Sequence, residues 1–196
     1  MYRQPPCHVS KAAVKKFPFV GTIADMCGCL FIDRGNSKAR MEMLDKIKGR
    51  QVECEQGVYP PLIIYPEGGT TNGSCLVKFK KGAFSGLRSV KPLIFKYKYK
   101  YFNIENSVLN FVAMTALMAT NFYGELTISE MPVFMPNEYF FKHHSREGEE
   151  KWETYARVMR DLMALESGLE ISELAIEEKY KYKELLFPNI KGKHSD

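Results

Sequence analysis

The sequence predicts an α/β fold in which a mixed sheet is flanked by helices. Three observations over the 196 residues lead to this prediction: short apolar runs that end at turn residues, longer segments with apolar residues at helical spacing, and the alternation of the two kinds. The chain contains no internal repeat. We expect residues 1–168 to form the domain and residues 169–196 to add a C-terminal helix and tail.

Two buried strands are expected in the N-terminal third of the chain. Residues 1–20 contain three prolines and are expected to be irregular. The apolar run 27–32 predicts one strand, and the apolar run 62–65 predicts another. Between them, apolar residues at helical spacing predict a helix over 36–48, followed by a loop over 53–60.

The C-terminal part is expected to combine two strands with two helices. The strands are predicted over 90–99 and 124–133. Apolar residues recur at i, i+3, i+4 and i+7 from Trp152, which predicts an amphipathic helix with Gly168 as its C-cap. Residues 170–187 predict a second, charged helix.

The most apolar segment of the chain covers residues 108–119, with the sequence VLNFVAMTALMA. A helix that crosses a bilayer needs about 20 apolar residues, so this segment is too short to span one. It is expected to form either a core helix or a helix that lies in a membrane interface.

Positive charge is concentrated in the first half of the chain. Residues 1–100 hold 18 Lys and Arg against 7 Asp and Glu, whereas the whole chain has a formal net charge of only +5. Such an excess attracts anions, which include phosphate, nucleic acid and acidic lipid; the alternative is an ordinary solvated face. No acid lies between Glu67 and Glu105, and the bases there are Lys78, Lys80, Lys81, Arg88, Lys91, Lys96, Lys98 and Lys100.

Several functions are disfavoured by the residues. Five cysteines are an odd number in a chain of this size, which favours a reducing compartment over a disulfide framework. The pair Cys27 and Cys29 has no second Cys/His pair at ligand spacing, so no metal site is expected. Lysines and aromatic residues alternate over 95–101, which places them on opposite faces of a strand, and no nucleic-acid partner is expected.

One polar turn stands out because it directly follows a predicted buried strand. Its glycines let the backbone approach a ligand, and its threonines and asparagine offer neutral donors. Asp33-Arg34 closes what we expect to be the neighbouring strand, and an arginine there binds phosphate in a bidentate manner. The candidate binding residues for an anion are therefore Arg34, Glu67, Gly68, Gly69, Thr70, Thr71 and Asn72.

Four motifs in order resemble the PlsC-type glycerolipid acyltransferases, and among them most the lysophosphatidylcholine acyltransferase branch. The motifs are Ser10-Lys11 with Val14, Pro18 and Gly21, then Phe31-Ile32-Asp33-Arg34, then Tyr65-Pro66-Glu67-Gly68, then Val90-Lys91-Pro92. The resemblance implies acyl transfer from acyl-CoA, as cosubstrate, to the hydroxyl of a lysophospholipid. It also implies that Arg34 and the turn hold the phosphate and glycerol of the acceptor, with no resident cofactor.

The sequence departs from the family pattern at two places. Gly69 stands where the family usually has threonine, and none of the four histidines is followed five positions later by an aspartate. The family uses the histidine of an H-x-x-x-x-D motif as its general base, so the catalytic residue is unknown here. We therefore expect a PlsC-like fold that lacks its N-terminal catalytic segment.

Two interpretations remain open. In one, the domain is inactive and is retained as a lipid-binding or architectural subunit of a membrane assembly with other protein chains. In the other, the protein is an active lysophospholipid acyltransferase whose catalytic segment lies outside this chain. Either way, we expect it at a membrane surface that faces a reducing compartment, on the endoplasmic reticulum or mitochondria.

Overall fold

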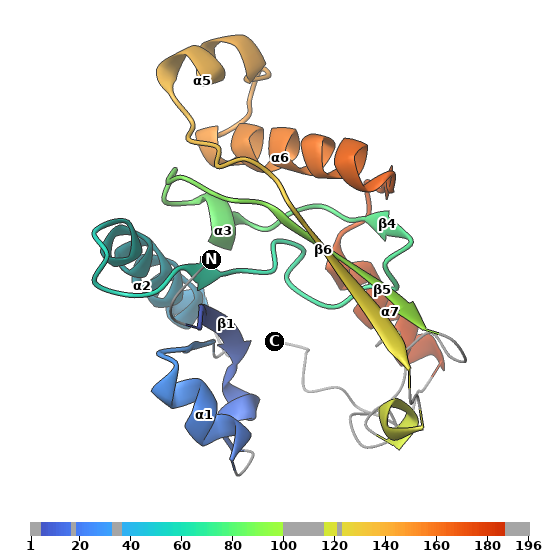
Figure 1. The fold of residues 1–196 in the computed structure, drawn as a ribbon. Helices are drawn as coiled ribbons and strands as arrows, with labels where there is room; N and C mark the ends of the chain where they lie inside the picture. The colour runs from blue at the N-terminus through green and yellow to red at the C-terminus, as the bar shows by residue number, and fades with distance from the viewer. Residues whose placement is uncertain (1–4, 17–18, 33–36, 100–115, 121–122, 187–196) are drawn as a thin grey trace. The chain divides into compact units, whose positions relative to one another are not determined.

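A computed structural model describes residues 5–16, 19–32, 37–99, 116–120 and 123–186. The chain divides into two compact units, each described by itself. The first comprises residues 1–66, 80–88 and 194–196, and the second comprises residues 67–79 and 89–193. Helices flank small sheets in a mixed α/β arrangement, which confirms the predicted fold class (Figure 1).

The first unit is built on a three-stranded parallel sheet. Its strands are β1 (Cys7–Lys11), β2 (Leu30–Ile32) and β3 (Leu62–Ile63), in the order β2-β1-β3. The register pairs Val9 with Leu30 and Cys7 with Leu62. The other elements of this unit are the 3-10 helix η1 (Ala12–Lys16) and the helices α1 (Val20–Met26), α2 (Ser37–Glu55) and α3 (Lys81–Phe84).

Arg50 is one of the side chains through which helix α2 contacts the rest of its unit. The guanidinium donates a hydrogen bond to the carbonyl of Gly28 (2.9 Å) and lies 3.8 Å above the ring of Tyr59. A planar cation stacked on an aromatic face stabilises such a contact beyond the hydrogen bond itself. On the same helix Ile47 is buried, so α2 contributes both an apolar and a cationic side chain to the packing of its unit.

The second unit has its core around α5 (Glu138–His144) and α6 (Lys151–Ser167). Tyr155 and Met159 of α6 are fully or almost fully buried, as the helical periodicity predicted. A capping box joins Glu150 and Glu153 at its start, and Gly168 ends it in the left-handed conformation (φ 70°). The amphipathic helix and its C-cap are thus confirmed.

Two small sheets complete the second unit. β5 (Leu93–Tyr99) pairs with β6 (Gly124–Glu130) as an antiparallel ribbon, seen as the long green and yellow arrows in Figure 1. β4 (Cys75–Leu76) pairs in parallel with β7 (Glu170–Ile171), and α7 (Ile176–Leu186) follows β7.

Three sequence predictions of local structure were wrong. Residues 7–11 are not irregular but form the central strand of their sheet, because β2 and β3 satisfy their backbone groups from both sides. The expected loop over 53–60 begins later, since helix formers extend α2 to Glu55 and Gly57 (φ 76°) follows. The expected helix over 170–187 begins at Ile176, because residues 170–171 pair with β4.

The other strands are shorter than predicted, and the apolar segment lies mostly outside the described residues. The run 27–32 forms a strand only over its last three residues. Residues 108–115 are not among those described, and residues 116–119 are helical. Within the described ranges, no helix combines the length and the apolar character that crossing a membrane requires.

Candidate functional site

Hydrogen bonds within the loop stabilise the predicted binding turn, Glu67 to Asn72. The Glu67 carboxylate accepts a hydrogen bond from the Thr71 hydroxyl (3.1 Å) and another from the backbone N–H of Val77 (3.3 Å). Asn72 Oδ1 accepts from the backbone N–H and the hydroxyl of Ser74. These hydrogen bonds stabilise the conformation of the turn. The Glu67 carboxylate therefore has a structural role within its own loop.

Burial raises the pKa of the Glu67 carboxyl, although the hydrogen bonds from Thr71 and Val77 act in the opposite direction. Folding therefore disfavours ionisation of this group. Its contribution to stability is present below its ordinary pKa and is lost as the pH rises through the raised value. A carboxylate held this way is a poor partner for a second anion, so a phosphate would have to contact other groups of the turn.

Helix α7 packs directly against this turn. A Cβ atom at Gly69 would lie 2.9 Å from Cγ1 of Ile176 and 3.4 Å from the hydroxyl of Tyr180. The ammonium of Lys179 donates a hydrogen bond to the Thr70 carbonyl (2.6 Å). Gly69 is thus a position where a close approach requires glycine. The sequence motifs did not reveal this neighbour, since α7 lies about a hundred residues further along the chain.

The segment before α7 continues the same contact. The backbone N–H of Lys78 donates to the carbonyl of Leu174 (3.0 Å), and the backbone N–H of Ser172 donates to the carbonyl of Leu76 (2.9 Å). Glu173 pairs with Lys78 and with the buried Arg160. Residues 172–180 therefore lie along one side of the loop that contains the candidate turn.

Arg34, the predicted phosphate ligand, lies outside the described residues, and its place in the site stays a prediction. The strand before it, β2, was expected to neighbour β3, and this expectation was wrong because β1 lies between them. All three strands run parallel, so β2 and β3 still end at the same edge of their sheet. The five residues from Gly68 to Asn72 likewise remain predicted ligands.

His8 has a position that the motif analysis missed. It lies in β1, and its ring stacks on that of Tyr65 at 6.5 Å and 24°, directly before the Pro66-Glu67 step. Within the described part of the chain, no carboxylate lies at ion-pair distance from this imidazole. The alternating pattern of residues 7–11 was the available signal for a strand that places His8 there.

Ion pairs partly neutralise the acid-free basic block. Three of its lysines pair with glutamates from the acidic C-terminal half: Lys78 with Glu173 (3.3 Å), Lys98 with Glu125 (3.8 Å) and Lys91 with Glu130. The charge asymmetry of the sequence is therefore smaller in space than along the chain.

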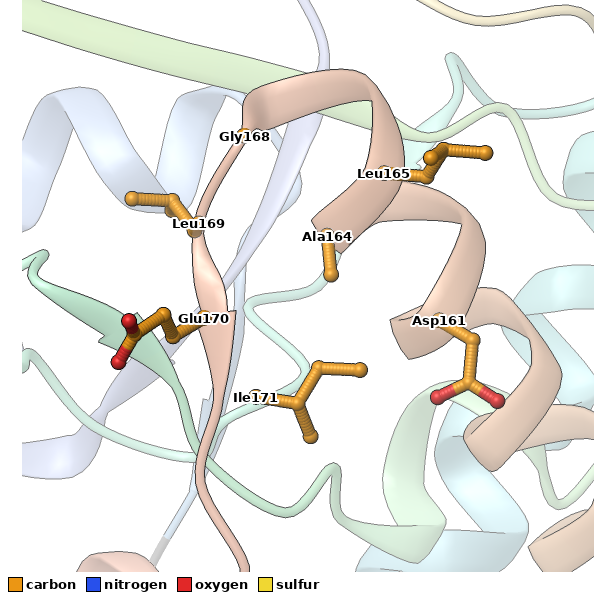
Figure 2. A pocket seen from close by; sticks show the side chains of 7 residues that line it. All are labelled: Asp161, Ala164, Leu165, Gly168, Leu169, Glu170 and Ile171. Atoms are coloured by element: carbon orange, nitrogen blue, oxygen red, sulfur yellow. The ribbon is translucent and has the colours of Figure 1, made fainter.

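An open depression of about 640 Å³ lies between the end of α6 and β7, and it shares no residue with the turn. In Figure 2 the Ile171 side chain lies between the strand and α6, whereas the Glu170 carboxylate points away from the helix. Its two ionisable groups are the carboxylates of Asp161 and Glu170, which suit no phosphate. Within the described ranges, no three His, Cys, Asp or Glu side chains form a metal-binding group.

Comparison with known proteins identifies the family. The Acyltransferase family profile matches residues 1–97. The chain is 30% identical over 190 residues to lysophospholipid acyltransferase LPEAT1 of Arabidopsis thaliana, which covers 94% of this chain and 45% of the relative. It is 28% identical over 172 residues to human lysophosphatidylcholine acyltransferase 1, covering 87% of this chain and 30% of the relative.

The chain spans less than half the length of the curated relatives that it matches. No solved structure matches it. All four sequence motifs fall within residues 1–97, the range that the family profile matches. The chain therefore belongs to the PlsC-type acyltransferase family and is similar to the lysophospholipid acyltransferases of plants and animals.

Proposed function

We propose that the chain binds a lysophospholipid through the Glu67–Asn72 turn and takes part in acyl transfer from acyl-CoA to that lipid. The observation that carries the proposal is the similarity, over 94% of this chain, to a relative named as a lysophospholipid acyltransferase. The turn after β3 supports it, because its internal hydrogen bonds order the loop in advance. A preorganised loop binds a ligand with a smaller loss of conformational entropy.

In this proposal each part of the site has its own task. Arg34 binds the phosphate of the acceptor with two parallel hydrogen bonds, and the backbone and hydroxyl groups of the turn bind its glycerol. The lysines of the basic block attract the phosphates of CoA and an anionic membrane surface. The domain acts at a membrane of the endoplasmic reticulum or mitochondria.

The 196 residues contain no H-x-x-x-x-D motif, so this proposal assigns no general base to them. A positioned base accelerates a reaction by about 10²–10⁴-fold. We therefore infer that these residues act as a lipid-binding or architectural part of a membrane assembly. The alternative is an active acyltransferase in which residues outside this sequence supply the base.

Binding and turnover of the purified chain test the proposal together. We expect a short-chain lysophosphatidylcholine, kept monomeric, to bind the chain, and Arg34→Ala to weaken that binding by about tenfold through loss of a charge-assisted bidentate contact. Arg40→Ala, an exposed arginine of α2, is the matched control and should bind as the wild type does.

Turnover tests whether the 196 residues carry a general base of their own. With acyl-CoA and the same lipid, we expect no acylated product above the uncatalysed background. Robust acylation would show that the 196 residues carry a base that the motif analysis missed. Absence of lipid binding by the wild-type chain would contradict the proposed function itself.

A further inference from the structure

Helix α7 lies against the turn that we propose as the acceptor site, although α7 is not part of the family motifs. The acyltransferase profile ends at residue 97, whereas α7 covers Ile176–Leu186. Residues of α7 nevertheless contact the turn at two successive positions, Gly69 and Thr70.

One face of α7 makes these contacts. Ile176 is 3% exposed and occupies the space above Gly69, while Lys179 and Tyr180 follow it at i+3 and i+4. Residues at these spacings lie on one side of a helix, so the burial of Ile176 also fixes where Lys179 and Tyr180 lie. The buried side chain of Ile176 therefore positions Lys179 and Tyr180 beside the turn.

Both polar groups reach the turn. The Lys179 ammonium is 2.6 Å from the Thr70 carbonyl, and the Tyr180 hydroxyl is 3.4 Å from where a side chain at position 69 would begin. An ammonium carries three N–H donors and a full positive charge, and a phenol hydroxyl both donates and accepts. Because Gly69 has no side chain, α7 supplies a polar side chain, Tyr180, next to this position, and Lys179 supplies one next to Thr70.

We propose that Lys179 and Tyr180 form part of the phosphate-binding site: Lys179 contributes a cation, and the Tyr180 hydroxyl donates a hydrogen bond to the acceptor phosphate beside Thr70. This inference rests on the proposed function, because it takes the phosphate of a lysophospholipid as its ligand. The charged residues nearest to Lys179 along the helix are Glu177, Glu178 and Lys181, and Glu178 pairs with Lys181 (2.8 Å).

The chain contains its own matched control for this proposal. The dipeptide Lys179-Tyr180 is repeated as Lys181-Tyr182, whose two residues are exposed and are not among the described contacts of the turn. Lys179→Gln and Tyr180→Phe therefore remove the same groups as Lys181→Gln and Tyr182→Phe, on the same helix and with the same change in charge.

The experiment titrates the full chain with monomeric short-chain lysophosphatidylcholine. We expect Lys179→Gln to weaken binding by about tenfold and Tyr180→Phe by about threefold, while the two control variants bind as the wild type does. Lys179→Arg should restore most of the affinity, and the salt dependence of binding should be weaker in Lys179→Gln.

Three outcomes would overturn the inference. Unchanged binding by Lys179→Gln contradicts this inference alone and leaves the proposed function intact. Equal losses in Lys179→Gln and Lys181→Gln indicate a diffuse charge effect instead of a site. No binding by the wild-type chain contradicts both the proposed function and this site. Fluorescence of the single tryptophan, Trp152, monitors folding in every variant.

Discussion

The Glu67–Asn72 turn and the β5–β6 ribbon belong to the same unit but have opposite relations to solvent. The turn is polar in sequence, yet its backbone and carboxylate are engaged by Val77 and by α7. The ribbon is apolar on one face, yet Tyr97 is 57% exposed and Leu126 is 47% exposed. In these two regions, burial follows from the position of partner segments and not from the polarity of the local sequence.

The register explains the exposed face of the ribbon. Phe95 pairs with Ile128 and Tyr97 with Leu126, so these four side chains share one face. The rings of Tyr97 and Tyr99 stack at 6.1 Å on that face. The expected separation of lysines from aromatic residues is therefore present, and the aromatic face is partly exposed to solvent.

The largest expected effect comes from removing the cover of the turn. Ile176→Ala should lower the free energy of unfolding by about 3 kcal/mol, because it empties a buried site against Gly69. Gly69→Ala should cost about 1 kcal/mol, since its Cβ would press on Ile176. Chemical denaturation of the single variants and of the double variant measures both values.

The double variant sharpens this test. Its loss should be smaller than the sum of the single losses, because the new methyl group at position 69 occupies space that Ile176 leaves. Leu185→Ala, on the exposed side of α7, is the control and should change stability by less than about 0.5 kcal/mol. Additive effects would mean that α7 does not cover the turn.

A substitution in the core of the second unit, away from the turn and the ribbon, should have an intermediate effect on stability. The hydrogen bond from Arg157 lowers the pKa of Glu149 to about 2, against burial, and the Arg146 N–H and the Thr154 hydroxyl contribute in the same direction. Because folding lowers this pKa, the stabilisation is present above about pH 4.5 and is lost as the pH falls towards 2.

Glu149→Gln should therefore lower stability at neutral pH by about 2 kcal/mol and flatten the acid limb of the stability curve. Thermal unfolding between acidic and neutral pH measures this. Glu147→Gln, an exposed neighbour, serves as the control. An unchanged acid limb in Glu149→Gln would show that the Arg157 pair does not stabilise the core on which both regions depend.

The smallest effect is expected in the ribbon. Tyr97→Thr combined with Leu126→Thr removes two exposed apolar side chains and keeps residues that favour strands. Stability should change by only about 0.5 kcal/mol, measured by chemical denaturation. Ile94→Thr, which removes a buried side chain from the opposite face of β5, should cost several times more. Equal losses would mean that the ribbon's apolar face is covered.

Much of the local structure could be predicted from the sequence. The period of Trp152, Tyr155 and Met159 predicted α6, because a helix that buries one face must repeat apolar residues at that spacing. Gly168 ends it, since a left-handed residue satisfies the last carbonyls at little cost. The strand β1 escaped prediction because the prolines on either side of it indicated an irregular segment, although residues 7–11 alternate.

The sequence by itself determined the family, through four ordered motifs, and it located the polar turn after β3. Only the tertiary structure decided that β1 separates β2 from β3, that the basic block meets distant glutamates, and that α7 lies against Gly69. The physical reason is that sequence motifs and the spacing of apolar residues reflect constraints between residues close together in the chain. Contacts such as Lys179 with Thr70 join residues more than a hundred positions apart, and packing alone selects them.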